Sequence, residues 1–157
     1  MNPRSLGLAF AATSALSLAC TEAPTGPDTL SLEASVSSPS IALGQTDTLT
    51  FRLRNLTPST ISLTFGSSCQ VQSFIETVND GVVYPPHGGY VCLTVITTLT
   101  LAPFAQKTIT QVVRGDTVPG TFTEPTLPPG RYGGHAQLSA YNPIVELRSP
   151  TVGFEIR

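Results

Sequence analysis

Apolar and polar residues alternate without a break along Thr48-Leu49-Thr50-Phe51-Arg52-Leu53-Arg54, the stretch that decides the fold class. Because successive side chains of a β-strand point to opposite faces, the two leucines and the phenylalanine share one face of this stretch. The same alternation returns in Thr60-Ile61-Ser62-Leu63-Thr64-Phe65, after turn residues that include Pro58. The two runs predict a β-hairpin with one face on a core and the other in water.

Short strand patterns continue along the chain. Further strands are expected at residues 30–36, 69–78, 82–84, 90–101, 108–113, 132–140 and 152–156, separated by turn residues. Asp80-Gly81 between two apolar runs is a strong hairpin signal, because both central residues of such a turn take positive φ. The 14 prolines and 13 glycines would interrupt helices repeatedly. The pattern therefore predicts an all-β domain, an antiparallel sandwich or barrel.

The N-terminal residues have the pattern of an export signal. Arg4 is followed by residues 6–19, which carry no charge and are rich in leucine and alanine. This run is shorter than the ~20 apolar residues that a membrane-spanning helix needs. A basic start, a short apolar core and a small residue before the cleavage site are typical of secretory signals.

The step Ala19-Cys20 resembles the lipobox of bacterial lipoproteins. The resemblance implies that residues 1–19 are a lipoprotein signal peptide, that Cys20 is lipidated, and that 20–28 is a flexible tether to a domain at 29–157. The protein is then exported and lipid-anchored to the bacterial cell membrane or outer membrane. Ser17 stands where this motif favours leucine. The alternative is an ordinary secretory signal cut near Ala19, without a lipid anchor.

Cys69 and Cys92 form an even pair once Cys20 carries lipid. Two cysteines in an oxidising compartment usually pair, and two β segments joined through the Asp80-Gly81 hairpin could bring their Cα atoms to the required ~5.5 Å. Closing this loop would contribute about 3 kcal/mol through chain entropy. A reactive thiol or a metal site is the alternative, although neither cysteine lies in a Cys-x-x-Cys motif.

The order of segments between residues 48 and 140 resembles the BsuPI-type proteinase inhibitor domain. The matching segments are the strand ending at Asn55, residues 61–65, the Cys69 strand leading into 80–84, residues 97–103, and residues 127–132. The resemblance implies an immunoglobulin-like antiparallel β-sandwich with a BsuPI-like core at 48–140, and it raises proteinase inhibition as the activity.

The chain departs from that family at three places. Pro103-Phe104 stands where the family has Pro-Gly, Val112-Val113 stands where its next strand usually carries tryptophan, and residues 85–90 replace an Arg/Trp-rich segment. No inhibitory residue is carried over from the family to a position of this chain.

Catalytic motifs are absent from the sequence. It contains no Gly-x-Ser-x-Gly, His-Glu-x-x-His or phosphate-binding glycine loop. His87 and His135 each lie beside glycines, which predicts solvent-facing histidines. Glu76 and Asp80 could form a carboxylate pair, but the hairpin turn already explains Asp80. The acidic residues are too dispersed to predict a calcium site. We expect no catalytic residue, no metal and no cofactor; a hydrolase with a non-standard site is the remaining enzymatic alternative.

The expected partners are a membrane, through lipid on Cys20, and another envelope or secreted protein, with a protease among the candidates. Nucleic acid is not expected, because the net charge is −2 and no basic stripe is present. The proline-rich loop 115–130 and the neighbouring loop 85–90 are the expected binding surface, since rigid loops lose little entropy on binding. The tyrosines either join a binding patch or cap the edge of the core; they are Tyr84, Tyr90, Tyr132 and Tyr141.

Two functions outside catalysis therefore remain open. The first is a non-enzymatic cell-envelope lipoprotein whose β-sandwich is a protein-binding module and a candidate proteinase inhibitor. The alternative is a structural or accessory envelope lipoprotein with no inhibitory activity, which recruits or spaces other envelope proteins.

Overall fold

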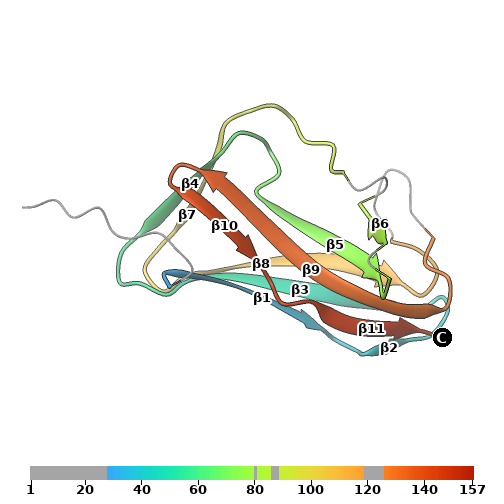
Figure 1. Cartoon of the computed structure of the whole chain (residues 1–157). Coiled ribbons are helices and arrows are strands. Elements are labelled where there is room, and N and C mark those ends of the chain that lie inside the picture. Colours follow the sequence, from blue (N-terminus) through green and yellow to red (C-terminus); the bar gives the residue numbers. More distant parts are fainter. Residues whose placement is uncertain (1–27, 80, 86–88, 119–125) are drawn as a thin grey trace, which may run out of the picture.

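The chain folds as an immunoglobulin-like antiparallel β-sandwich in a computed structural model that describes residues 28–79, 81–85, 89–118 and 126–157 (Figure 1). Within these ranges no residue is helical. The strands are β1 (Leu30–Val36), β2 (Ser40–Ile41), β3 (Thr46–Asn55), β4 (Ile61–Phe65), β5 (Val71–Thr77), β6 (Val82–Tyr84), β7 (Thr97–Leu101), β8 (Gln106–Arg114), β9 (Gly130–Tyr141), β10 (Ile144–Arg148) and β11 (Val152–Ile156).

The strands form two main layers. One sheet has the order β1-β3-β8, and the other has the order β2-β11-β9-β5-β6. Strand β10 pairs with residues 137–141 of β9 and β11 pairs with residues 130–134, so these two short strands follow one another along the same edge of β9. A separate β4–β7 ladder joins the end of β9 through a bridge between Thr64 and Asn142.

The alternating runs bury the faces that the sequence predicts. Leu49, Phe51 and Leu53 of β3 are buried. The facing side of β9 supplies small residues, and an added Cβ at Gly134 would lie 2.7 Å from a methyl carbon of Leu49. Glycine at this position therefore allows the two sheets to approach closely. Further core residues are Ile61, Leu63, Phe65, Ala136, Leu138 and Ala140.

The predicted hairpin between residues 48–54 and 60–65 is wrong. Strand β3 pairs with β1 and β8, whereas β4 pairs with β7. Alternation fixes which face of a strand is buried but not which strand lies beside it. Buried Asn55 explains the crossing: its Nδ2 donates to the carbonyl oxygens of Ser59, Leu101 and Ala102 at 2.7, 3.2 and 2.9 Å. This side chain joins the end of β3 to the end of β7.

The segment before β7 also differs from its prediction. Residues 90–101 were expected to form one long strand, but only residues 97–101 do so. Residues 90–96 form no ladder with another strand, and the N–H of Val95 turns back to the carbonyl of Leu93 at 2.9 Å; side chains hold this segment in place, as described below. The hairpin expected around Gly81 is present, with β6 pairing to β5 through Ile75 and Tyr84. Asp80 lies outside the described residues.

Candidate functional site

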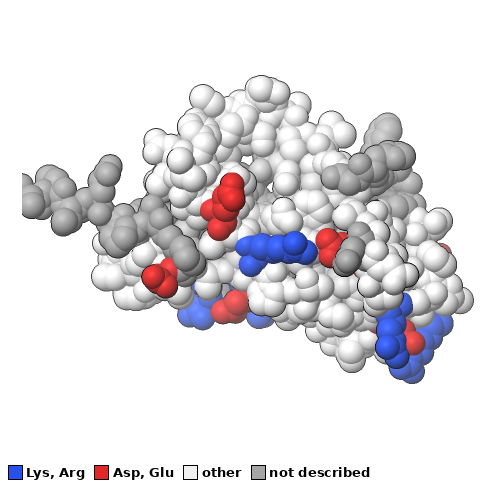
Figure 2. Space-filling view, in the orientation of Figure 1, with Lys and Arg blue, Asp and Glu red and all other residues white. Residues whose placement is uncertain are grey.

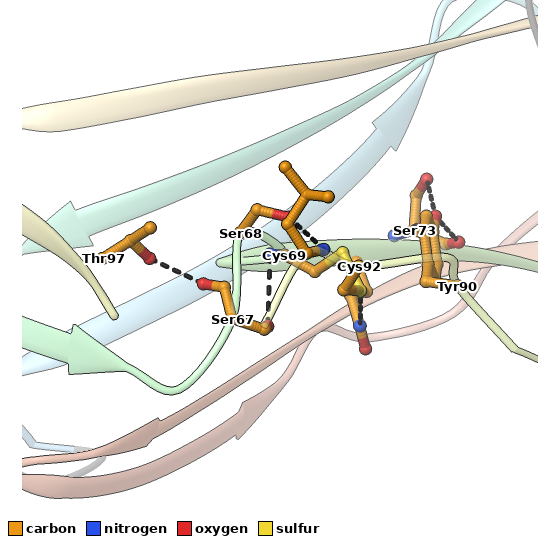
Figure 3. Close-up of a disulfide and its surroundings, with 9 residues drawn as sticks. Ser67, Ser68, Cys69, Ser73, Tyr90, Cys92 and Thr97 are labelled. Carbon is orange, nitrogen blue, oxygen red and sulfur yellow. Dashed lines mark hydrogen bonds between the residues drawn. A yellow bond between two sulfur atoms is a disulfide. The ribbon is translucent and has the colours of Figure 1, made fainter. Parts of the chain in front are cut away.

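A disulfide between Cys69 and Cys92 is at the centre of the candidate site (Figure 3). The S–S distance is 2.00 Å and the Cα atoms are 5.6 Å apart. The bond ties the residue two positions before β5 to the middle of the segment that precedes β7. Gln72 of β5 donates from Nε2 to the sulfur of Cys92 at 3.7 Å. The bond therefore fixes the segment to one edge of the β5 sheet.

Tyr90 makes a second attachment to the same edge. The N–H of Ser73 donates to the Tyr90 hydroxyl at 2.9 Å, and this hydroxyl donates to the carbonyl of Ser73. One phenol group thus satisfies both backbone groups that a neighbouring strand would otherwise pair. Burial raises the pKa of Tyr90 above its ordinary value, so the hydroxyl keeps its proton. The ring also packs edge-to-face against Phe74 and Tyr84 at 5.9 and 5.8 Å between centroids.

Two further contacts hold the following residues. The N–H of Leu93 donates to Ser68 Oγ at 2.9 Å, and the N–H of Ser68 donates back to the Leu93 carbonyl at 3.0 Å. At the far end, Thr97 Oγ1 donates to the Ser67 carbonyl at 2.7 Å (Figure 3). We refer to residues 90–97, held in this way, as the clamped segment.

The clamped segment exposes apolar side chains to solvent. Val91 is fully exposed, Leu93 is 72% exposed and Ile96 is 70% exposed, with Val95 also exposed. Within the ranges that the structure describes, neither the N–H nor the C=O of Val91 has a hydrogen-bond partner. Soluble proteins rarely expose a contiguous row of large apolar side chains unless a partner covers it. The clamped segment is therefore an apolar contact segment that is fixed to the sheet at several points.

A hollow of about 330 Å³ lies beside the clamped segment, between the edges of β5 and β8. Tyr90, Val71 and Ile109 line it together with Ser68, Cys69, Gln70 and Lys107. Deeper in, Ser73 Oγ donates to Gln111 Oε1 at 3.1 Å and so connects the two sheets. The site thus combines a projecting segment with an adjacent depression that a partner side chain could enter.

His135 is not solvent-facing, so that prediction is wrong. It lies within β9 with no exposed surface and stacks on Phe74 at 5.1 Å between ring centroids, with 10° between the planes. Its glycine neighbours belong to the strand: a Cβ at Gly133 would lie 2.5 Å from Thr151 Cγ2. Close packing, not a loop, therefore explains these glycines.

The charge state of His135 follows from its surroundings. Burial lowers its pKa, the carboxylate of Glu76 opposes that effect, and Arg148 adds to it. The Glu76 oxygen lies 3.7 Å from His135 Nδ1 and 3.6 Å from the Arg148 guanidinium. Burial as the leading cause favours a neutral ring near pH 7. The Glu76 carboxylate thus lies between two side chains, the ring of His135 and the guanidinium of Arg148.

Several residues singled out in the sequence lie outside the described ranges: Cys20 with the signal and tether, Asp80, His87, and residues 119–125 of the loop 115–130. The base of that loop is described, and Val118 and Leu127 are completely buried there. Of loop 85–90, residues 85, 89 and 90 are described, and Tyr90 belongs to the clamped segment. Tyr132 caps the core edge, donating from its hydroxyl to the Pro128 carbonyl at 2.6 Å.

The sequence pattern of the clamped segment does not mark it as a contact surface. Apolar residues at 90–96 suggested a buried strand, yet Val95-Ile96 breaks the alternation that a one-sided strand requires. Cys92 is the other signal, because a disulfide can fix a segment to the edge of a sheet without the hydrogen bonds of a strand.

Over the described ranges, no helix has the length and apolar character needed to cross a bilayer. In the same residues, no group of three or more His, Cys, Asp or Glu side chains is placed to hold a metal ion.

The fold and the site define an immunoglobulin-like β-sandwich with a projecting contact segment. No protein-family model matches the chain, and no curated protein is significantly similar to it. Among solved structures, the chain is similar to the CARDB domain of the PF1109 protein from Pyrococcus furiosus in complex with di-metal ions, with 18% identity and a TM-score of 0.48 over 80% of this chain and 90% of that one.

Two other solved structures show a comparable likeness. The C-terminal domain of wzt has 10% identity and a TM-score of 0.49 over 82% of this chain and 74% of that one. The DNA glycosylase AlkC of Pseudomonas fluorescens, bound to DNA containing an abasic-site analogue, has 21% identity and a TM-score of 0.47 over 82% of this chain. The chain spans 30% of the AlkC chain. At these identities and TM-scores the likenesses carry no argument about function.

Proposed function

We propose that this chain is a non-enzymatic, lipid-anchored protein of the bacterial cell envelope whose β-sandwich binds and inhibits a secreted or envelope protease. The observation that carries the proposal is the clamped segment, which presents exposed apolar side chains on a backbone fixed at Tyr90, Cys92, Leu93 and Thr97. A segment that is rigid before binding loses little conformational entropy when a partner covers it.

The geometry around Val91 favours a protease as the partner. Recognition clefts bind extended peptides through main-chain hydrogen bonds and through pockets for individual side chains. Val91 offers an exposed side chain, and its main-chain groups have no partner among the residues that the structure describes; it lies between two anchors, Tyr90 and Cys92. If the Val91–Cys92 bond were cut, Ser73 would still hold one new end through Tyr90, and Cys69 would hold the other through the disulfide. Both ends would stay in place, which opposes release of the products.

Two sequence observations support the same function. The BsuPI-type resemblance of residues 48–140 raises proteinase inhibition, and the lipobox-like Ala19-Cys20 step supports an envelope location. A disulfide is compatible with the oxidising side of the membrane.

The test is inhibition of a panel of purified serine proteases that differ in specificity. We expect inhibition constants from nanomolar to micromolar for enzymes that accept small aliphatic residues, and none for trypsin-type enzymes, whose pocket requires a basic residue. Val91→Lys should shift inhibition toward the trypsin-type enzymes. Val78→Lys changes another exposed valine, in the β5–β6 turn, and should leave the profile unchanged. The proposal fails if no protease is inhibited or if Val91→Lys leaves the profile as it was.

One observation favours the alternative of an accessory envelope lipoprotein without inhibitory activity. The Leu93 carbonyl accepts hydrogen bonds from the N–H groups of Ser68 and Val95, so it cannot pair with the main chain of a partner. A partner that contacts only the side chains of Leu93, Val95 and Ile96 would suit this geometry. Co-purification of a stable envelope partner that the Leu93→Lys variant does not bind, together with an inactive protease panel, would support this alternative.

A further inference from the structure

The outer face of strands β5, β9 and β10 carries a group of polar side chains, some half-buried and some exposed. We define the outer polar face as Gln72 of β5, Gln137, Ser139 and Tyr141 of β9, and Glu146 and Arg148 of β10. Cross-strand pairing places these residues side by side: Gln72 and Arg148 both pair with Gln137, and Glu146 pairs with Ser139. The side chains of directly paired residues are about 5 Å apart at Cβ, so they form a continuous row.

The outer polar face is hollowed along this row. A depression of about 340 Å³ is lined by side chains that include Gln137, Ser139 and Arg148. A second depression of about 150 Å³ adjoins it, sharing Gln72, Gln137 and Ser139 and adding Ser67 and Gln70. Small-molecule and glycan-sized sites typically have volumes of about 300–1,000 Å³. Figure 2 shows this side of the molecule as mostly uncharged surface with a few acidic and basic groups, some of which lie next to each other.

The end of the row is apolar and aromatic. Tyr141 is 51% exposed and pairs across the strands with Ile144, which is 82% exposed. An aromatic ring has a negative face, which attracts the slightly positive C–H groups of a ring packed against it. Tyr141 therefore offers a stacking platform at one end of a row of amides and hydroxyls.

We propose that the outer polar face binds a neutral glycan chain, with one sugar ring on Tyr141 and the next rings hydrogen-bonded to Gln137, Ser139 and Gln72. Sugar hydroxyls both donate and accept hydrogen bonds. Glutamine amides and serine hydroxyls also do both, whereas charged groups do only one.

Other occupants fit the chemistry of this face less well. The core of a protein-binding patch is depleted in charge and rich in buried apolar contact, but the centre of this row is amide and hydroxyl. Nucleic acid requires several cations to neutralise its phosphates, and the row has one, Arg148, whose guanidinium lies 3.6 Å from the Glu76 carboxylate. A neutral glycan needs neither an apolar centre nor an excess of positive charge.

The test is isothermal titration of the purified whole chain with two neutral oligosaccharides, chitohexaose and cellohexaose. Chitohexaose carries the N-acetyl groups found in cell-wall glycans, whereas cellohexaose carries hydroxyls alone. The oligosaccharide that binds more tightly therefore shows which of these two classes of glycan the face prefers. We expect saturable binding with dissociation constants in the micromolar to millimolar range. Tyr141→Ala and Gln137→Ala should each weaken binding by about tenfold or more, which corresponds to about 1.4 kcal/mol.

Two matched variants distinguish the loss of ring stacking from a loss of the fold and from an effect of the clamped segment. Tyr141→Phe keeps the ring and should bind within about threefold of the wild-type protein, whereas Tyr141→Ala should not. Leu93→Lys changes the clamped segment and should leave oligosaccharide binding unchanged, whatever it does to protease inhibition. The proposal is overturned if neither oligosaccharide binds, or if Tyr141→Ala binds as tightly as the wild-type protein while circular dichroism shows an intact fold.

Discussion

Asn55 shows how one side chain can determine a connection between sheets. It is 1% exposed, its amide group donates to three carbonyl oxygens, and its Oδ1 accepts from the N–H of Thr57 at 2.9 Å. These bonds join the end of β3, the turn after it and the end of β7. No other residue type of this size offers two donor hydrogens and an acceptor in the same plane.

Asn55→Ala is therefore expected to lower the free energy of unfolding by about 3 kcal/mol, because it removes the hydrogen bonds of a buried amide, including the one to the buried Leu101 carbonyl, and leaves a space in the core. Urea unfolding followed by circular dichroism measures this change, since the chain has no tryptophan. Asn79→Ala removes an exposed asparagine and should alter stability by less than about 0.5 kcal/mol. Equal stability of the two variants would contradict the role given to Asn55.

His135 makes the stability of the protein depend on pH, and the direction of its pKa shift gives the direction of that dependence. Burial lowers its folded-state pKa below the ordinary value of about 6.5, which the unfolded chain retains. Below about pH 6.5 the unfolded state therefore binds more protons at this position than the folded state, and stability falls as the pH falls. Well above that pH, His135 is neutral in both states and contributes no slope.

We expect the free energy of unfolding to decrease between pH 7 and pH 5 in the wild-type protein, and to decrease less in His135→Phe. Phenylalanine keeps the stack on Phe74 but does not titrate. The charged groups that face His135 are Glu76 and Arg148, and both remain in the variant. The measurement is the difference between the two stability profiles across this range. Parallel profiles would show that His135 does not cause the slope.

At the scale of elements, the sequence determined the buried faces more reliably than the strand partners. Alternation identified Leu49, Phe51, Ile61 and Leu63 as core residues, because one-sided burial has a period of two. It did not show that β3 and β4 belong to different sheets, since that depends on the distant carbonyls that Asn55 reaches. The buried state of His135 was missed for a similar reason: the residues that cover it come from other strands.

The clamped segment is the element that the candidate site depends on. The cysteines were predicted to pair, but the sequence alone could not show that the pair holds an exposed segment, because Ser68, Ser73 and Thr97 complete the attachment. Conversely, the loop 115–130 was expected to bind a partner, and the described part of it serves the core through Val118 and Leu127.

Replacing both Cys69 and Cys92 with serine tests this element. We expect a loss of about 3 kcal/mol in stability, from the entropy that the unfolded chain regains. Protease inhibition should weaken by about tenfold or more, because the free segment must be ordered on binding. Limited proteolysis should cut the variant within residues 91–96 at low enzyme concentrations. Leu93→Ala keeps the disulfide and should keep wild-type stability. Unchanged inhibition and unchanged proteolysis in the double variant would contradict the clamp.

At the scale of the whole molecule, the sandwich presents two surfaces of different chemistry. The clamped segment is apolar and is attached at the edge of β5 and to the residues before it, whereas the outer polar face covers β5, β9 and β10. Gln72 belongs to the second surface and contacts the disulfide of the first. An anchored protein with both surfaces could hold a protease close to envelope glycans, which joins the two proposals without making either depend on the other.

The anchor itself is a prediction from Cys20. With lipid on this residue, the wild-type chain should fractionate with membranes, and mass spectrometry of the mature N-terminus should show an acylated cysteine after removal of residues 1–19. Cys20→Ser should move the protein to the soluble exported fraction, because neither an acyl chain nor its nucleophile remains. Stability and protease inhibition in vitro should stay the same, since Cys20 lies outside the domain at 29–157. A free thiol at Cys20, or equal fractionation of the two proteins, would instead support an ordinary secretory signal cut near Ala19.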